Sequence, residues 1–525
     1  MKRKMSMMLA LAMAASLWVS GCGSSSKDEG TTKAAEAATT AAATAEATEA
    51  ATQAADQKDT TPIVLGCSYI ANNTNPVDSA WDLTAHGISE GIYMQNAEGE
   101  LVSRFVTDMT RDDDLTWTAA LTNAVKFSDG SDCDAQALAD CMNYLQENNS
   151  MTNGTAGKVT FTAESADKLK IVTERPTPVM KSLLAEWCNV VFKQAGDDFI
   201  YTGPYMVKKL DSGVSLELTP NPYYDDKADQ RSDVTLKVFS DTATMQQAFE
   251  GGEIDLMFGL TPEAAEILTG EGFTVKDYDA GYQYFAFTNL KDGPMADAAV
   301  RAAINQIIDR TEMTTALKGG RPANGIFAQY YSFAGDSAPA TDVEAAAKAL
   351  EGLGYAKNAD GIYEKDGKAL SIHMITYSSR ADLPLLMQLT ASQLAKAGVD
   401  STTEVVDDIG AALEAGEYDL AFYAQHTAPS GEPSAFLNMA LAEGGSRNYA
   451  GYKNDKVDEL LKKMGETEPG AERDQISKDI QAIVAEDLPI IYLVDPQWHV
   501  ALSDRVSDYV PYCGDYYCVN ADLGL

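Results

Sequence analysis

The sequence predicts an α/β protein with more than one domain, on three grounds. The chain has 525 residues, 45% of them hydrophobic, which is more than one ordinary core accommodates. Residues 234–257 read as a strand, a helix capped by Ser240 or Asp241 and ended by Gly251-Gly252, and a second short strand. This order is a βαβ unit, and residues 370–424 repeat it twice with alternating apolar strands and helices.

The first 21 residues have the organisation of an export signal. Lys2, Arg3 and Lys4 precede an apolar run that is too short to span a bilayer comfortably. The segment ends Val19-Ser20-Gly21-Cys22, which resembles the lipobox of bacterial lipoproteins. The resemblance implies cleavage before Cys22 and a lipid on its thiol that anchors the protein to the cell membrane. A plain secretory signal with a free cysteine is the alternative.

Residues 22–61 are low-complexity sequence rich in Ala, Thr, Glu and Ser. Such a segment buries too little apolar surface to offset its ordering entropy. We expect a disordered tether between the lipid and the folded body, with a helical stalk as the alternative.

Composition and motifs argue against several functions. The net charge of −38 disfavours nucleic acid and a polybasic membrane contact. The acidity favours either a cationic ligand or simply a solvated surface. The sequence has no H-E-x-x-H, no G-x-S-x-G and no Walker A motif, and its four histidines are scattered. We therefore expect no enzyme, no cofactor and no ATPase activity in this chain.

The elements up to residue 280 follow from local patterns. Gly203-Pro204 starts an extended run that Pro220 and Pro222 stop, which predicts a hairpin at residues 205–218. Strands are also expected at 63–69 and 101–106, short strands at 115–130, and helices at 134–146 and 179–184.

The elements after residue 280 show clearer periodicity. A strand is expected at residues 282–289, and Val300, Ala303, Ile304, Ile307 and Ile308 share one face of a helix. A capping box beginning at Thr341 opens the next helix. Strands at 370–376, 402–406, 418–424 and 490–493, and helices at 383–397, 454–464 and 471–485, complete the prediction.

Three motifs carry a family resemblance. They are Thr202-Gly203-Pro204-Tyr205, Asn221-Pro222-Tyr223-Tyr224 and Gly252-Glu253-Ile254-Asp255, and they occur in this order. Together they resemble the extracytoplasmic solute-binding proteins, family 5, which serve ABC importers of the peptide and nickel class. Residues 125–130 and 300–310 are also similar to segments of that family.

The resemblance implies a two-lobed periplasmic-binding-protein fold of type II, peptide-binding class, with a small extra subdomain in the first lobe. Lobe I would comprise residues 62–80, 165–280 and 495–525, the insertion 81–164, and lobe II 281–494. The two crossings between lobes would allow hinge closure around a ligand. The implied function is capture of a short peptide or a small nickel chelate and delivery to permease and ATPase subunits by a monomeric lipoprotein. A sensor or chaperone lipoprotein and, less favoured, a secreted hydrolase are alternatives.

The segment from His426 to Leu437 bears on the ligand. Peptide binders of the family anchor the ligand's amino terminus with an Asp that corresponds here to Pro429, which cannot pair with an ammonium. The segment instead is similar to members assigned to nickel or metal-chelate uptake, as are residues 377–384. Arg380 is expected to clamp a ligand carboxylate, or else is a surface arginine at a helix start. His426 is expected at the cleft, either contacting a chelated metal or as a simple polar residue. Further cleft candidates are Tyr93, Arg104, Tyr423, Arg447, Tyr516 and Tyr517, although most tyrosines belong to cores.

Apart from Cys22, six cysteines remain in an exported chain, where disulfides are permitted. Cys513 with Cys518 and Cys133 with Cys141 are candidate pairs, and free buried thiols are the alternative for each. The C-x-x-C spacing of a zinc site is missing.

Overall fold

The computed structural model describes residues 61–96, 99–153, 156–337, 340–512 and 514–525. The predicted export signal, Cys22 and the tether up to residue 60 lie outside the described residues. Over these ranges, no helix has the length and apolar character needed to cross a membrane.

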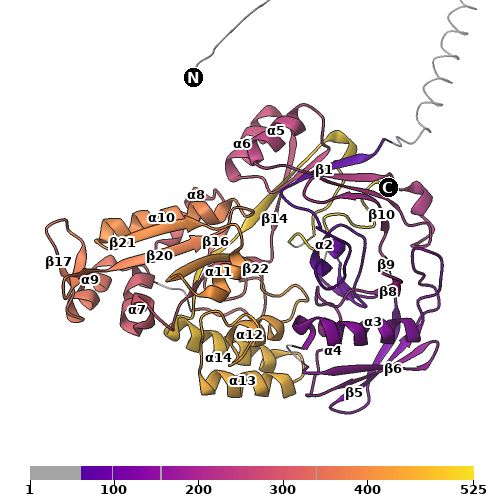
Figure 1. Cartoon of the computed structure of the whole chain (residues 1–525), viewed down its shortest axis with the longest axis horizontal. Helices are drawn as coiled ribbons and strands as arrows, with labels where there is room; N and C mark the ends of the chain where they lie inside the picture. Colours follow the sequence, from indigo (N-terminus) through magenta and orange to yellow (C-terminus); the bar gives the residue numbers. More distant parts are fainter. Residues whose placement is uncertain (1–60, 97–98, 154–155, 338–339, 513) are drawn as a thin grey trace, which may run out of the picture. The chain divides into compact units, whose positions relative to one another are not determined.

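A seven-stranded sheet forms the centre of what we call the first lobe (Figure 1). Strand β1 lies between β12 and β13 and is parallel to both, so α5 makes the predicted crossover with β1 inserted in the middle. Asp241 caps α5 by accepting from the Thr244 N–H at 2.8 Å. The strands in sheet order are β10 (Tyr205–Asp211), β11 (Ser215–Pro220), β12 (Val234–Val238), β1 (Ile63–Cys67), β13 (Leu256–Phe258), β24 (Gln497–Leu502) and β14 (Thr274–Asp279). The helices α5 (Thr242–Glu250) and α6 (Pro262–Glu271) cover one face.

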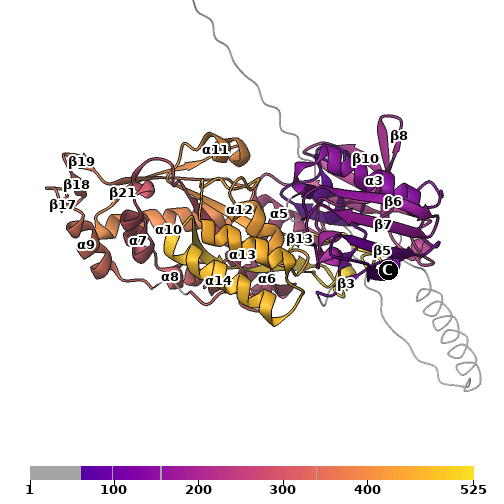
Figure 2. The same cartoon turned by 90° about the horizontal axis from the view of Figure 1, so that it is seen from below.

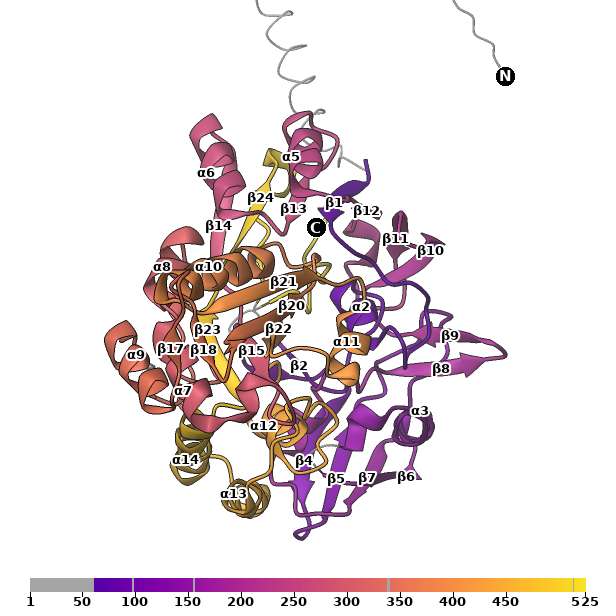
Figure 3. The ribbon, with the colours of Figure 1, turned by 60° about the vertical axis from the view of Figure 1, so that its left-hand side comes forward.

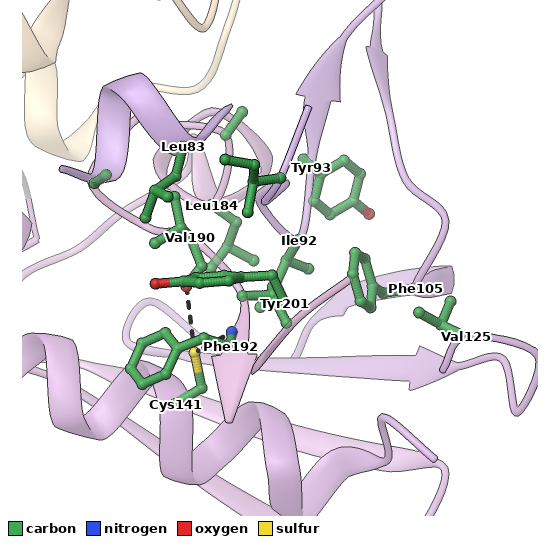
Figure 4. Close-up of a cluster of buried hydrophobic side chains, with 14 of the residues drawn as sticks. Leu83, Ile92, Tyr93, Phe105, Val125, Cys141, Leu184, Val190, Phe192 and Tyr201 are labelled. Atoms are coloured by element: carbon green, nitrogen blue, oxygen red, sulfur yellow. Dashed lines mark hydrogen bonds between the residues drawn. The ribbon is translucent and has the colours of Figure 1, made fainter. Parts of the chain in front are cut away.

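A second, four-stranded antiparallel sheet carries the helix α3 (Ala135–Asn148) on one face, as Figure 2 shows. Its strands in order are β4 (Val106–Arg111), β5 (Thr116–Leu121), β7 (Lys168–Thr173) and β6 (Val159–Ser165). Figure 4 shows Cys141 of α3 beside Phe192 and Tyr201, and these side chains belong to the same core cluster as β1. The insertion therefore shares its core with the first lobe. Smaller elements here are α2 (Ala80–Ala85), β2 (Met94–Gln95), β3 (Leu101–Val102), α4 (Met180–Leu183), β8 (Phe192–Ala195) and β9 (Asp198–Tyr201).

A six-stranded sheet forms the second lobe (Figure 3). Every residue of β15 is buried, because helices cover both faces. The strands in order are β16 (Arg321–Pro322), β23 (Ile490–Asp495), β15 (Tyr282–Thr288), β22 (Leu420–His426), β20 (Ser371–Thr376) and β21 (Asp400–Val405). One face packs on α7 (Ala298–Ile307), α8 (Arg310–Ala316), α9 (Val343–Gly352) and α10 (Asp382–Ala397). The other packs on α11 (Ile409–Ala415), α12 (Ser434–Leu441), α13 (Asp455–Glu466) and α14 (Ala471–Asp487). A small sheet holds β17 (Ala356–Lys357), β18 (Tyr363–Lys365) and β19 (Lys368–Ala369).

The predicted βαβ units of the second lobe are confirmed, since β20 is parallel to both β21 and β22. The chain passes between the two large sheets twice, from β14 to β15 and from β23 to β24. The C-terminal tail, described at residues 503–512 and 514–525, packs on the first lobe, where Val519 N–H donates to Ala85 O at 2.9 Å.

Two local expectations were wrong. Asp342 rather than Thr341 caps α9, accepting from the Ala345 N–H at 2.8 Å, while the Thr341 hydroxyl donates to Ile308 O. The strand expected at 101–106 is broken into β3 and β4, since the Ser103 hydroxyl accepts from the N–H groups of Phe105 and Val106 and bends the chain.

Of the two alternatives for Cys133 and Cys141, a disulfide or free buried thiols, the structure has the second, since both thiols are free and buried. Cys141 Sγ instead donates to Val190 O and accepts from Phe192 N–H, each at 3.3 Å (Figure 4). Cys518 is also a free thiol, and its proposed partner Cys513 lies outside the described residues.

Candidate functional site

A cavity of about 640 Å³ lies between the two lobes. This volume is within the usual range for a small-molecule site. The lining residues are Tyr69, Asp78, Trp81, Asp82 and Trp187 from the first lobe; Tyr282, residues 377–380, 406–409 and 423–426, and Arg447 from the second; and Tyr516 from the tail.

The second-lobe wall is formed where parallel strands end. Residues 377–380 follow β20, residues 406–409 follow β21, and His426 ends β22. Because the carboxyl ends of parallel strands meet at one edge of a sheet, these three segments converge on the cavity. Arg380 and His426, both candidates from the sequence, lie on this edge.

The Arg380 guanidinium is engaged by the protein itself. It pairs with Asp515 at 2.5 Å, and its carbon atom lies 4.9 Å from the ring centres of both Tyr282 and Trp498. Asp515 also accepts from the hydroxyls of Tyr282 at 2.6 Å and Tyr69 at 2.7 Å. Arg380 thus sits in an aromatic enclosure with its charge compensated, so a ligand carboxylate would have to compete with Asp515.

Arg447, a weaker candidate from the sequence, has a different environment. It is half-buried in the cavity wall, and its Nη1 donates to the Gln425 side-chain oxygen at 3.2 Å. Across the described residues, no Asp or Glu oxygen lies within ion-pair distance of it. Arg447 therefore offers the cavity a positive charge that the surrounding protein does not neutralise.

His426 is buried, with its ring 5.6 Å from Tyr282 and 5.3 Å from Tyr516, centre to centre. Burial lowers its pKa to about 4, although the Asp515 carboxylate opposes this shift. The imidazole is therefore neutral at neutral pH, which is the form that binds metals. In the part of the chain that the structure describes, no three His, Cys, Asp or Glu side chains are grouped as metal ligands.

The remaining candidates divide into two groups. Tyr423 and Tyr516 line the cavity beside Tyr377. Tyr93, Arg104 and Tyr517 do not line it. Tyr93 packs in the first-lobe core (Figure 4), Arg104 pairs with Glu90 and stacks 3.6 Å from the Tyr224 ring centre, and Tyr517 packs on Tyr512.

Several lining residues were not anticipated from the sequence. Trp81 and Trp187 lie in segments with no motif, and only the fold brings them to the cavity. Asp515, which pairs with the lining residue Arg380, was likewise not anticipated. For Trp81 the sequence offered one signal. Residues 81–93 are again apolar after a polar loop, and exposed aromatic residues in such a segment often form the wall of a binding site.

A cavity between two α/β lobes that are joined by two short passages defines a class of protein that binds a solute by hinge closure. Residues 100–448 match the family model described as "Bacterial extracellular solute-binding proteins, family 5 Middle", and the chain belongs to this family. Among individual proteins, the chain is similar to the nickel-binding protein NikA of Staphylococcus aureus, with 23% identity over 432 residues, 81% of this chain and 86% of NikA. It is also similar to the oligopeptide-binding protein AppA of Bacillus subtilis, with 25% identity over 333 residues, 59% of each chain.

Solved structures give the same fold. NikA of Staphylococcus aureus in complex with Ni(L-His)2 superposes with a TM-score of 0.79 at 22% identity, covering 88% of this chain and 99% of NikA. AppA of Bacillus subtilis in complex with a nonapeptide superposes with a TM-score of 0.74 at 15% identity, covering 87% and 97%. Family membership makes this chain an extracellular solute-binding protein, and the solved structures confirm the two-lobed fold.

Proposed function

We propose that this chain is the solute-binding lipoprotein of an ABC importer and that it captures a small carboxylate-bearing solute, either a short peptide or a metal chelate such as one of nickel. The observation that carries the proposal is Arg447, whose charge no described carboxylate neutralises, on the wall of the interlobe cavity. A carboxylate gains most from a cation that is free of other partners and partly removed from water.

The rest of the lining suits such a solute. Trp187, Tyr377 and Tyr423 supply flat apolar surface for the body of the ligand. The imidazole of His426 on the cavity wall is neutral at neutral pH, and this is the form that binds a metal ion. Closure of the lobes would then present the loaded protein to permease and ATPase subunits, with Cys22 holding it at the membrane.

Calorimetry on the purified body tests the proposal, with trialanine and Ni(II)–L-histidine as the two probes. Whichever probe the wild-type protein binds, we expect Arg447→Gln to weaken its binding at least tenfold, or about 1.4 kcal/mol. Arg175→Gln, which removes an exposed arginine that does not line the cavity, is the matched control. Unchanged affinity in Arg447→Gln would contradict the proposed contact between Arg447 and a carboxylate of the solute.

A growth experiment separates import from sensing. Deletion of the gene should abolish uptake of the bound solute, and a lipid-free Cys22→Ala form should restore it poorly. Normal uptake in the deletion strain would instead favour a sensor or chaperone.

A further inference from the structure

A smaller cavity of about 50 Å³ adjoins the main one. The two share Trp187, Gln425 and His426 as lining residues, so the small cavity is a side chamber of the interlobe site. What distinguishes it is Glu186, which follows α4 in the first lobe and faces the segment after β22 in the second.

The Glu186 carboxylate has a hydroxyl partner but no cation. Its Oε1 accepts from the Ser430 hydroxyl at 2.6 Å. Within the described ranges, no Lys, Arg or His nitrogen lies within ion-pair distance of Glu186.

The neighbouring Glu432 shows the contrast. Arg473 donates to its Oε1 at 2.7 Å, and the Ser434 N–H donates to its Oε2 at 2.8 Å. Burial raises the pKa of Glu186 to about 7, the Ser430 hydroxyl lowers it, and the negative charge of Glu432 raises it further. The charge of Glu432 is thus compensated by Arg473, whereas Glu186 can lose its uncompensated charge only by taking up a proton or binding a cation.

Glu186 and Arg447 lie close enough to influence the same two side chains, Cys188 and Tyr516. Burial and Glu186 raise the pKa of the Cys188 thiol, while Arg447 lowers it. Likewise, burial is the main cause of the raised pKa of the Tyr516 hydroxyl, while Glu186 also raises it and Arg447 lowers it. A carboxylate and a guanidinium that have no ion-pair partner among the described residues therefore flank adjoining cavities, and a solute carrying both opposite charges would pair with both.

We propose that Glu186 binds a protonated amino group of the solute while Arg447 holds its carboxylate, so that the ligand is a dipolar molecule with a free ammonium, such as a short peptide. The volume of the side chamber suits an alkylammonium, and Trp187 lines the same chamber. This assignment rests on the proposed function and narrows its ligand class. A neutral metal bis-chelate, whose amino groups are bound to the metal, would leave Glu186 without a charge partner.

Native mass spectrometry tests the assignment with a defined mixture of dipeptides and tripeptides and with the same mixture after N-acetylation. We expect the wild-type protein to bind the free peptides at least tenfold better than the acetylated ones. Glu186→Gln should bind both mixtures with similar affinity, Glu186→Asp should keep part of the preference, and the exposed control Glu253→Gln should match the wild type. Melting temperatures of all variants establish that they are folded.

Equal binding of the two mixtures by the wild type, or binding of Ni(II)–L-histidine alone with no effect of Glu186→Gln, would overturn the assignment and leave the proposed function standing. Binding that keeps its preference for free amino groups but is insensitive to Arg447→Gln would instead contradict the carboxylate contact of the proposed function.

Discussion

At the scale of single residues, the buried pair Arg473–Glu432 fixes the segment that follows β22. Both side chains are more than 90% buried. Arg473 also donates to the carbonyl of Thr467 at 2.9 Å, so this one guanidinium joins the end of α13 to the loop before α12. Since Ser430 in that loop contacts Glu186, the ion pair helps to shape the ligand site.

Arg473→Met should therefore cost about 3 kcal/mol of unfolding free energy, because it leaves Glu432 buried and charged without a partner. Denaturant titration measures this cost. Lys453→Met, which breaks the exposed pair with Glu443, is the matched control and should change stability little. Equal effects of the two substitutions would show that Glu432 is neutral or solvated.

Residues on regular strands could be located from the sequence, and residues placed by long-range contacts could not. His426 was placed because β22 belongs to a repeated βαβ pattern. Asp515 meets Arg380 across 135 positions of sequence, and Glu186 meets Ser430 across 244. No local pattern encodes such pairs, because their geometry arises only when the lobes have formed.

At the scale of elements, strongly periodic segments were predicted well and edge strands were not. The helix α7 was evident from its apolar face. The strand β14 was missed because residues 274–279 are mostly polar and largely exposed at the edge of the sheet. Its extended form depends on pairing with β24, which follows more than 200 residues later.

The cap of α9 gives a test at the same scale. Asp342→Ala should destabilise the protein by about 1 kcal/mol, since the Ala345 N–H loses its acceptor. Asp342→Asn retains a capping oxygen and should stay close to the wild type. A comparison of unfolding midpoints measures both, and equal loss in the two variants would point to the charge of Asp342 rather than to the cap.

At the scale of the whole molecule, buried acids and the net charge of −38 both make the folded state less stable as the pH rises. Burial raises the pKa of Glu90 to about 7 although the Arg104 guanidinium opposes it, and burial likewise raises the pKa of Asp495 to about 7. Between the ordinary pKa of each acid and about 7, the folded state holds a proton that the unfolded state has lost. Stability therefore falls as pH rises through this window, and the loss is complete above it.

We accordingly expect a higher melting temperature near pH 5.5 than near pH 8, two values chosen at about the edges of this window. Salt separates the two causes, because about 0.5 M NaCl screens repulsion between surface charges but not proton uptake by buried groups. The difference should therefore shrink only partly in salt, and it should shrink further in Glu90→Gln. A difference that salt removes entirely would assign the effect to surface repulsion alone.

The relative placement of the lobes has its own test in Asp515. This carboxylate belongs to the tail that packs on the first lobe, and it joins Tyr69 of that lobe to Arg380 and Tyr282 of the second. Arg380→Gln or Asp515→Asn should each loosen this connection, increase the radius of gyration of the ligand-free protein in X-ray scattering, and speed ligand association. A double-mutant cycle on Arg380 and Asp515, measured by unfolding free energy, should give a coupling above about 1 kcal/mol.

The pair Arg321–Asp279 provides the control. It also joins the lobes, but its nitrogen and oxygen atoms are 3.6 Å apart and both side chains are about half exposed. Its coupling should be near zero, since solvent screens exposed charges. Similar couplings in the two cycles would mean that the aromatic enclosure of Arg380 contributes nothing, and that the lobes are held together by packing at the two chain passages instead.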